Sequence, residues 1–361
     1  MKILVVMKRF GANKDMVLDN FGRQIRLFEP LAKKHKIDFF CPDYTKKESK
    51  EITRNNIRYI IRPASLLKYI NLYNSLKTTI KKEKYNIIVA TTDPIIGILC
   101  YKISKKYNIP LVYDLQDNFE SYSAYKLPFV RNMDRKVLKE ADIVLSVSET
   151  LKEHISKIRK KPIYVINNGI ELGLFKSINK KEVRKKLNLP LNSKIIVLIG
   201  HVEKLKGGLL LLEAFRIVRK TIPDSYLLIS GKIESSINIK QGGIIFKEFP
   251  KREQVVLGIN AGDVAVLPNP VNSFTKYCFP YKLVEYMACK VPIVATDIGD
   301  VSLVLKKYQG SLCRPNDAND LAEKLIAQLR KDGKVNYGEE VKSREWKKLA
   351  NKVDKAISRL N

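Results

Sequence analysis

With 361 residues, of which 45% are hydrophobic and 29% charged, the chain is long enough for two domains and is not a disordered polypeptide. No apolar run approaches the roughly 20 residues that a membrane-spanning helix needs. The net charge of +30 is spread evenly, because residues 1–175 hold 33 of the 67 Lys and Arg and 18 of the 37 Asp and Glu. Since both halves therefore carry +15 and neither has an aromatic-interleaved basic tract or a zinc-finger pattern, we expect no nucleic-acid partner.

The first half of the chain alternates short apolar runs with helical patterns. It begins with a buried strand rather than a signal peptide, and the five cysteines are widely spaced, so we expect free thiols in the cytoplasm. Unbroken apolar runs are typical of parallel strands covered on both faces, and their alternation with helices predicts a doubly wound sheet. The expected strands are Lys2–Met7, Lys36–Phe40, Ile57–Ile61, Asn86–Ala90, Leu111–Asp114, Ile143–Val147 and Ile163–Ile166.

The same alternation then starts again, which predicts a second doubly wound domain. The expected strands are Lys194–Ile199, Tyr226–Ser230, Ile244–Phe246, Val264–Leu267 and Ile293–Ala295, with helices at about 207–221, 251–261, 281–289 and 317–331. We place the domains at 1–175 and 176–338, and an amphipathic last helix at about 339–361 is expected to pack back on the first domain. Ligands of open α/β sheets bind outside the carboxyl ends of the strands, so a cleft between the two domains is the expected site.

The most informative segment is 279–296, in which Pro280 opens a helix. The exposed amides at such an end favour a phosphate, and Lys282 and Glu285 project from the same side of the first turns, where they are suited to a phosphate and a ribose. A second segment, 199–207, leaves a strand and places Lys206 before the next helix, where it could meet a diphosphate. A solvated Lys–Glu pair is the simpler interpretation of Lys282 and Glu285 taken alone.

Taken together and in order, these segments resemble the family 4 glycosyltransferases over essentially the whole chain. Segment 279–296 is similar to the family's nucleotide-sugar signature, and Gly200 and Lys206-Gly207 stand where the family has a glycine and a Lys-Gly pair. Further matches are 141–148, 165–171 with Phe175, Asp297-Ile-Gly299, Gly310 and Pro315-Asn-Asp317. The resemblance implies the GT-B fold, with two Rossmann-like domains facing each other across a cleft. It also implies an acceptor on the first domain, a nucleotide sugar on the second, retention of anomeric configuration, and no essential metal or other cofactor.

The chain departs from the family pattern at three positions that bear on chemistry. Tyr277 replaces the first of two signature glutamates, His201 replaces an arginine that pairs with the lysine on the diphosphate, and Gln116 replaces a histidine near the sugar. Retaining transfer needs stabilised phosphate charge more than a fixed base, and Lys206, Lys282 and the helix end can supply that stabilisation. The expected catalytic residues are Lys206, Gln116 and Asp117.

Two further sets of residues are expected to bind the substrates. The expected donor-binding residues are Gly200, His201, Lys206, Gly231, Tyr277, Phe279, Tyr281, Lys282, Leu283 and Glu285. The expected acceptor-binding residues are Gly22, Arg23, Asp114 and Glu120. The acidic group Asp114, Asp117 and Glu120 could alternatively hold a metal or cap the next helix, and we expect no metal.

The leading hypothesis is a glycosyltransferase that moves a sugar from a UDP- or GDP-sugar to a glycan or lipid-linked acceptor in cell-surface polysaccharide or glycolipid synthesis. The basic surface is compatible with peripheral contact at the anionic inner face of the membrane. The alternative is a non-catalytic GT-B module that assists a partner glycosyltransferase, for which Tyr277, His201 and Gln116 are the reason. An epimerase acting on a nucleotide sugar is a further enzyme alternative, without an additional carboxylate or histidine set to support it.

Overall fold

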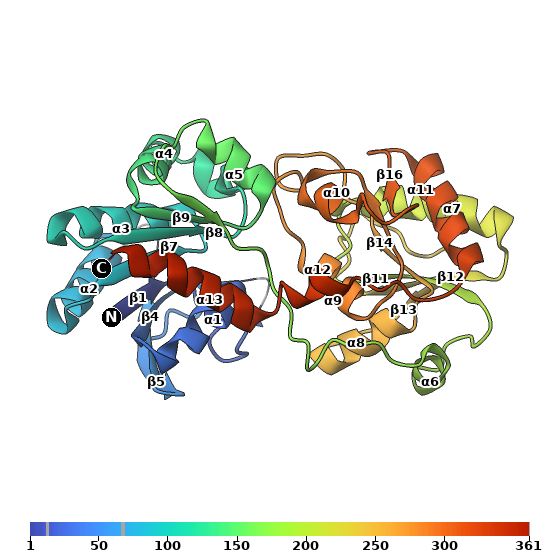
Figure 1. The fold of residues 1–361 in the computed structure, drawn as a ribbon, viewed down its shortest axis with the longest axis horizontal. Coiled ribbons are helices and arrows are strands. Elements are labelled where there is room, and N and C mark those ends of the chain that lie inside the picture. The colour runs from blue at the N-terminus through green and yellow to red at the C-terminus, as the bar shows by residue number, and fades with distance from the viewer. Residues whose placement is uncertain (12–13, 66–68, 361) are drawn as a thin grey trace. The chain divides into compact units, whose positions relative to one another are not determined.

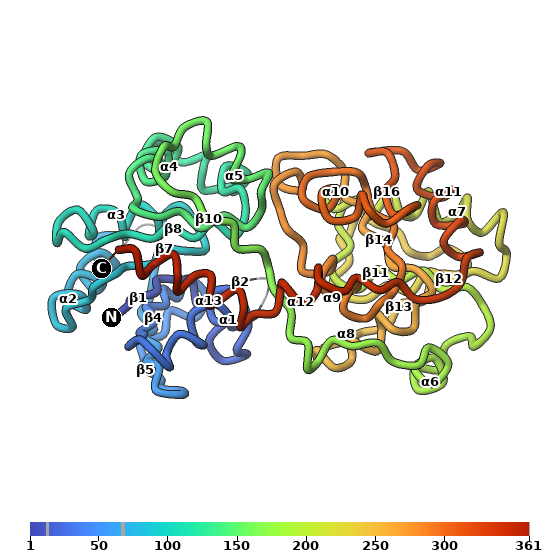
Figure 2. The backbone as a smooth tube through the Cα atoms, in the orientation of Figure 1, coloured from blue at the N-terminus to red at the C-terminus, as the bar shows by residue number. Residues whose placement is uncertain are grey.

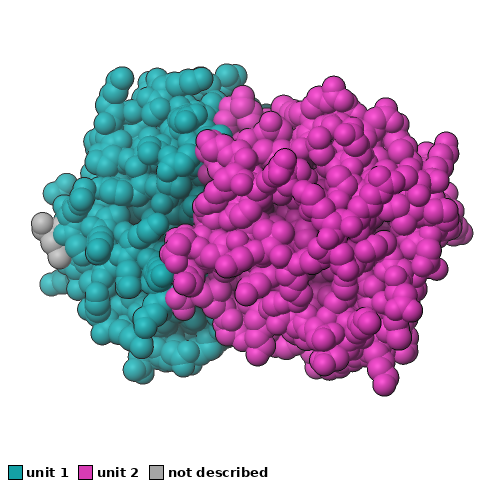
Figure 3. All heavy atoms as spheres, turned by 45° about the vertical axis from the view of Figure 1, so that its right-hand side comes forward, with its two compact units in different colours: residues 1–167, 346–361 teal, residues 168–345 magenta. Residues whose placement is uncertain are grey.

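The computed structural model describes residues 1–11, 14–65 and 69–360, and its chain divides into two compact units. Unit 1 comprises residues 1–167 together with 346–361, and unit 2 comprises residues 168–345. Figure 3 colours the two units separately, and Figure 2 lets the reader follow the chain from one into the other and back.

Within its described residues, unit 1 is built on an eight-stranded sheet in the order β10-β9-β8-β7-β1-β4-β6-β5. Neighbouring strands pair in parallel except β5, which is antiparallel to β6. Figure 1 shows α3, α4 and α5 on one side of this sheet and α1 and α13 on the other. The strands are β1 (Lys2–Val6), β4 (Lys36–Asp43), β5 (Lys50–Arg54), β6 (Ile57–Pro63), β7 (Ile87–Thr91), β8 (Leu111–Leu115), β9 (Ile143–Ser146) and β10 (Ile163–Val165), besides the short pair β2 (Phe10–Gly11) and β3 (Lys14–Asp15).

The helices of unit 1 begin where the sequence supplies caps. Asp93 caps α3 by accepting a hydrogen bond from the amide of Ile96, with Pro94 as the first helical residue, and Ser148 caps α5 in the same way. The helices are α1 (Arg23–Phe28), α2 (Tyr69–Glu83), α3 (Pro94–Tyr107), α4 (Val130–Glu140), α5 (Glu149–Ser156) and α13 (Trp346–Ile357), with 3-10 turns η1 (Glu29–Lys33), η2 (Phe119–Ser121), η3 (Ser123–Lys126) and η5 (Ser358–Leu360).

Unit 2, all of whose residues are described, has a six-stranded parallel sheet in the order β13-β12-β11-β14-β15-β16. One hydrophobic cluster of its core lies between this sheet and the helices α7 and α11, which pack against each other. The strands are β11 (Lys194–Ile199), β12 (Ser225–Ser230), β13 (Ile244–Phe246), β14 (Val264–Leu267), β15 (Ile293–Thr296) and β16 (Leu312–Cys313). The helices are α6 (Lys180–Lys186), α7 (Gly208–Thr221), α8 (Arg252–Asn260), α9 (Tyr281–Ala288), α10 (Gly299–Leu305), α11 (Ala318–Lys331) and α12 (Gly338–Lys342), with the turn η4 (Lys204–Lys206).

The chain leaves unit 1 after Asn167, earlier than the boundary at residue 175 that the sequence suggested. The reason lies in the contacts of the next residues. The side-chain amide of Asn168 donates to the carbonyl of Phe279 at 2.6 Å, and Glu171 forms an ion pair with Arg252. These contacts hold the start of the connection to unit 2.

The expected helix at 339–361 is two helices in the structure, and Asn361 lies outside the described residues. The short helix α12 belongs to unit 2, where it contacts α9, while α13 belongs to unit 1, where it contacts α1. Asp354 of α13 accepts hydrogen bonds from Lys34 at 2.8 Å and is 2.7 Å from Nε2 of His35. His35 therefore contacts the last helix.

Candidate functional site

The sheet of unit 2 changes direction between β11 and β14, because the chain builds outward from β11 through β12 to β13 and then returns to β14 on the other side. Such a switch point is where open α/β sheets bind ligands. Two glycines allow the chain to pack closely there. A Cβ at Gly207 would lie 1.8 Å from the carbonyl oxygen of Pro268, and one at Gly231 would lie 2.7 Å from the carbonyl carbon of Gly200. Gly200, Gly207 and Gly231 all have positive φ, a backbone conformation that favours glycine over other residues.

Lys282, in the first turn of α9, lies directly over Gly200. A Cβ at Gly200 would be 2.5 Å from Cε and 3.0 Å from Nζ of this lysine, so a larger residue would displace the ammonium group. Burial, and next the positive charge of Lys206, lower the pKa of Lys282 to about 8, against the opposing influence of Glu285 and Glu203. A cation whose charged form is disfavoured in this way gains most from an anionic ligand.

Lys206 stands at the end of η4 and is one-third exposed. Its ammonium lies 3.1 Å from Oε2 of Glu203 and 5.9 Å from the ring centroid of Phe274. Nδ1 of His201 lies 3.3 Å from the other oxygen of the same Glu203. Glu203, which sequence reasoning did not single out, therefore joins His201 and Lys206 at the mouth of the switch point.

The predicted donor residues on α9 divide into buried and partly buried side chains. Leu283 is fully buried and Phe279 is 1% exposed, so both support the helix from within. Glu285 and Tyr281 are partly buried, as is Tyr277 in the preceding loop. The structure thus brings Gly200, Gly231 and Lys282 into contact, while Leu283 and Phe279 serve the packing beneath them.

Two residues that the sequence did not flag hold these pieces in place. The hydroxyl oxygen of buried Tyr286 accepts a hydrogen bond from the backbone amide of Ile199 at 3.1 Å, which fastens α9 to the end of β11. The side-chain amide of Asn272 donates to the carbonyl of Leu205 at 3.0 Å, and its oxygen accepts from the amides of Phe274 and Thr275. Asn272 thereby ties the loop before α9 to the turn that carries Lys206. A tyrosine beside Glu285 and an asparagine among prolines are the only sequence signals for these roles.

At the carboxyl edge of the unit 1 sheet, two of the predicted acceptor-binding residues, Arg23 and Asp114, belong to a network of hydrogen-bonded side chains. Arg23 and Asp114 are both buried and form an ion pair with an Nη2–Oδ1 distance of 2.7 Å. Nη1 of Arg23 also donates to the carbonyls of Ile166 and Asn167, at the point where the chain leaves this unit. In this arrangement Arg23 and Asp114 hold the edge of the sheet together and present no exposed surface to a ligand. Gly22, which precedes α1, has φ of +113° and is partly buried.

Gln116 joins the same network, whereas Asp117 and Glu120 point to other partners. The side chain of Gln24 donates to that of Gln116, which in turn donates to the carbonyl of Thr92 at 3.4 Å. Asp117 accepts from the hydroxyl of Tyr122 at 2.8 Å. Glu120 is exposed and lies near Arg135 and His154, at 3.7 Å and 3.3 Å. His154 therefore faces the predicted acceptor residue Glu120.

Two negative findings apply to the described residues. Among them, no three His, Cys, Asp or Glu side chains gather in a group that could hold a metal ion. No helix within 1–11, 14–65 and 69–360 is long and apolar enough to cross a membrane.

Two family models together match most of the chain. The model described as "Glycosyltransferase Family 4" matches residues 25–174, and "Glycosyl transferases group 1" matches residues 179–348. The first of these ranges lies in unit 1 up to Asn167 and ends within unit 2, and the second includes the lysines and glycines of the unit 2 switch point.

Among curated relatives, the putative teichuronic acid biosynthesis glycosyltransferase TuaC of Bacillus subtilis is 30% identical over 226 residues, which are 62% of this chain and 56% of TuaC. An Escherichia coli UDP-Gal:alpha-D-GlcNAc-diphosphoundecaprenol alpha-1,3-galactosyltransferase is 25% identical over 74% of this chain and 72% of its own. Among solved structures, Anabaena HepE in complex with UDP matches with a TM-score of 0.76 and 17% identity, covering 99% of this chain and 100% of HepE. This likeness confirms the predicted GT-B fold class with two Rossmann-like domains.

Proposed function

Because the chain is a family 4 glycosyltransferase with the GT-B fold, we propose that it transfers a hexose, with retention of configuration, from a UDP-sugar to a lipid-linked or glycan acceptor of a cell-surface polysaccharide. The galactosyltransferase relative is named for a UDP-sugar donor and a diphosphoundecaprenol acceptor, and TuaC for teichuronic acid synthesis. HepE has been solved with UDP and with UDP-glucose. These names support UDP as the nucleotide of the donor and a lipid-linked acceptor in cell-surface polysaccharide synthesis.

One observation carries the proposal, namely that Lys282 lies over Gly200 at the unit 2 switch point, where burial and the nearby charge of Lys206 lower its pKa. Two cations held near one another in partial burial are suited to a ligand with more than one negative charge, as a diphosphate has. In sugar transfer the diphosphate is the leaving group, and its charge grows as the glycosidic bond breaks. Lys206 and Lys282 would stabilise that charge, which is the main electrostatic contribution that an enzyme can make to this step.

The remaining roles follow from the same arrangement. Glu285, one turn into α9 from Lys282, would bind the ribose hydroxyls, and His201 would be displaced from Glu203 as the diphosphate enters. With two lysines to neutralise the diphosphate, we propose that the reaction needs no divalent metal. In unit 1 the partly buried Gln116 and Asp117 end a strand at the carboxyl edge, where they would face the acceptor or the sugar.

The test is a binding and hydrolysis screen of the purified chain. The panel contains UDP, GDP, ADP, CMP and dTDP together with their common sugar derivatives. Binding is measured by thermal shift, and hydrolysis of the sugar derivatives by nucleotide release, each with EDTA or with Mg²⁺. We expect a shift with UDP and slow release of UDP from one UDP-hexose, both unaffected by EDTA. The anomeric proton coupling of the transferred sugar, measured by NMR, then reports retention or inversion.

A matched pair of variants assigns the activity to the lysine site. Lys206→Ala removes one of the two cations, whereas Lys204→Ala removes an exposed lysine of the same turn. Loss of UDP release in the first and not in the second supports the proposal. Binding of no nucleotide at all would instead favour a non-catalytic module that assists a partner enzyme.

A further inference from the structure

The connection between η3 and α4 carries an exposed apolar tip. The four residues Lys126, Leu127, Pro128 and Phe129, here called the tip, are all exposed, with Leu127 at 42% and Phe129 at 81%. Phe129 is the most exposed large hydrophobic side chain of the described residues. It also adopts a left-handed conformation, with φ of +70°, which is unfavourable for a residue with a Cβ. An aromatic ring placed in water from a strained backbone indicates a use for that ring outside the fold.

The base of the tip is firmly held, so its exposure does not come from a frayed segment. The hydroxyl of Tyr125 donates to Asp134, a buried carboxylate of α4 that also accepts from the hydroxyl of Tyr113. Burial raises the pKa of Asp134 to about 6. On the other side, Tyr122 donates to Asp117 and its ring lies 5.2 Å from that of Phe119. The tip is thus a short rigid projection anchored by two tyrosine hydroxyls.

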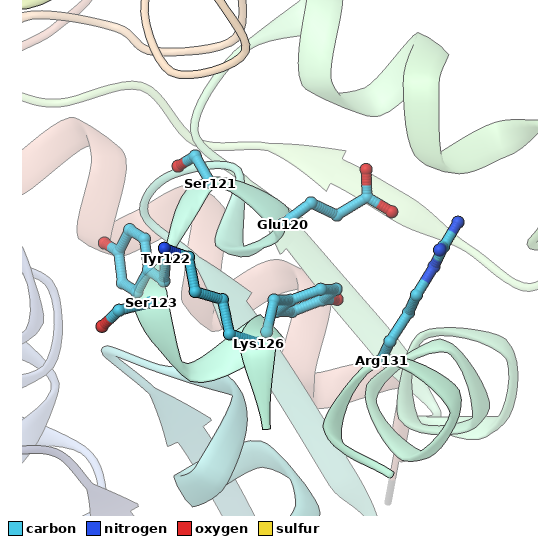
Figure 4. A pocket seen from close by; sticks show the side chains of 7 residues that line it. Glu120, Ser121, Tyr122, Ser123, Lys126 and Arg131 are labelled. Carbon is cyan, nitrogen blue, oxygen red and sulfur yellow. The ribbon is translucent and has the colours of Figure 1, made fainter. Parts of the chain in front are cut away.

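Basic side chains flank the tip. Lys126 and Arg131 are both exposed, and among the described residues neither has a hydrogen-bond or ion-pair partner. Figure 4 shows their side chains beside a pocket of about 470 Å³ that is also lined by Tyr122, Ser123 and one carboxylate, that of Glu120. Apolar residues between unpaired cations match the chemistry of an anionic lipid surface, where phosphates meet the acyl chains.

We propose that the tip and its two flanking cations form the membrane-docking surface of unit 1, in which Phe129 and Leu127 enter the headgroup region of an anionic bilayer and Lys126 and Arg131 contact lipid phosphates. This inference rests on the proposed function, because a lipid-linked acceptor has to be reached at a membrane surface. The tip follows Gln116 and Asp117 within one short stretch of chain after β8. Docking there would hold the carboxyl edge of this sheet close to acceptors embedded in the same bilayer.

The chemistry of the tip favours a membrane over nucleic acid or a protein partner. Duplex nucleic acid would use the two cations and leave Phe129 in water, and the sequence has no aromatic-interleaved basic tract that would extend the contact to a single strand. A protein partner of ordinary affinity needs about 800 Å² of surface on each side. Two apolar side chains on a narrow projection offer much less than that, whereas a bilayer accepts a single inserted aromatic ring.

The experiment uses the full chain and sedimentation with vesicles, either of phosphatidylcholine alone or with phosphatidylglycerol added. Phe129→Ser combined with Leu127→Ser removes the apolar contact, and Leu191→Ser, an exposed leucine of unit 2, is the matched control. Lys126→Gln combined with Arg131→Gln removes the charges, with Lys185→Gln and Lys186→Gln on α6 as the control for equal net charge. UDP release from the UDP-hexose is measured for every variant without vesicles.

We expect the wild-type protein to bind only the anionic vesicles. Binding should be about tenfold weaker in the variant without the apolar pair. It should be about fivefold weaker for each charge removed. The control variants and UDP release should be unchanged, which separates a failure of this inference from a failure of the proposed function. Equal vesicle binding by the tip variants and their controls would overturn the proposal. So would wild-type self-association without lipid that the serine pair abolishes, because the tip would then be a protein contact.

A fluorescent variant gives an independent readout. The chain has a single tryptophan, Trp346, which is 7% exposed and therefore insensitive to lipid. In Phe129→Trp, emission should shift to shorter wavelength when anionic vesicles are added and remain unchanged with phosphatidylcholine alone. An unshifted spectrum with bound anionic vesicles would show that the ring stays in water and would reject insertion of the tip.

Discussion

The carboxyl edges of the two sheets both carry charged side chains, but the charges are arranged differently. In unit 1 the charges at this edge are paired with one another, as in Arg23–Asp114 at 2.7 Å and Lys8–Asp93 at 2.5 Å. In unit 2 two lysines lie close enough that one lowers the pKa of the other, and three glycines with positive φ clear the space beside them. The side chains of the first edge are paired without a ligand, whereas the lysines of the second edge are suited to an anion.

This difference indicates how each edge responds to mutation. Removing one partner from a paired, buried edge leaves an uncompensated charge and lowers the stability of the unit. Removing Lys206 from the unit 2 edge breaks a partly exposed ion pair with Glu203 but also relieves repulsion with Lys282, so folding should be little affected and the loss should appear in ligand binding and turnover. Stability measurements and activity measurements on the same variants therefore distinguish the two edges.

The largest expected effect comes from Arg23→Ala, which leaves Asp114 buried without its cation. We expect the free energy of unfolding of unit 1 to fall by about 3–5 kcal/mol, measured by urea denaturation. Exposed Lys33→Ala is the control, with an expected change within about 0.5 kcal/mol. Replacing both partners, as Arg23→Met with Asp114→Leu, should recover part of the loss. A stable Arg23→Ala protein with impaired acceptor use would instead favour the acceptor-binding role that the sequence suggested.

Next in size is Lys206→Ala at the edge of unit 2. Turnover of the UDP-sugar should fall by about a hundredfold or more, because one cation that stabilises the leaving diphosphate is lost. Folding should be little changed, since the side chain is one-third exposed and lies near like charge. The measurement is kcat with the UDP-hexose found in the screen, compared with Lys204→Ala. Normal turnover in Lys206→Ala would remove this lysine from the mechanism.

Sequence reasoning predicted the strands well where the chain is buried on both faces. The strand β11 was expected at the residues where it occurs, because its run from Lys194 to Ile199 is almost wholly apolar. The edge strand β5 was not expected, because its residues alternate between exposed and half-buried and include Lys, Glu and Arg. The doublets of β2, β3 and β16 are too short to leave a periodic signal.

At the candidate site, the sequence indicated residues that lie in one motif but not pairs that folding brings together. Gly200, Lys206 and Lys282 were named from local patterns, and the structure places Gly200 and Lys282 in contact. Arg23 and Asp114 are 91 residues apart, and each alone is compatible with a solvated or ligand-binding side chain. Their mutual burial depends on the register of α1 and β8, which no local pattern specifies.

A smaller effect is expected from Glu285→Ala. If this carboxylate binds the ribose hydroxyls, its removal should weaken UDP binding about tenfold, the loss of roughly one hydrogen bond to a charged group. Isothermal titration with UDP measures this, and exposed Glu213→Ala on α7 is the matched control. The activity should fall with the affinity. Unchanged UDP affinity would restrict Glu285 to its electrostatic effect on Lys282.

The smallest effect is a pH dependence that the unit 2 edge should show and the unit 1 edge should not. With a pKa of about 8, Lys282 is mostly charged at pH 7 and mostly neutral at pH 8.5. Bound diphosphate favours the charged form, so UDP binding takes up a proton above pH 8, and the affinity should fall by up to about fourfold between these pH values. Lys282→Arg, which stays charged throughout, should bind UDP with the same affinity at both. A wild-type affinity that does not change with pH would mean that Lys282 is not in contact with the diphosphate, and the anion would then rest on Lys206 and the amides at the start of α9.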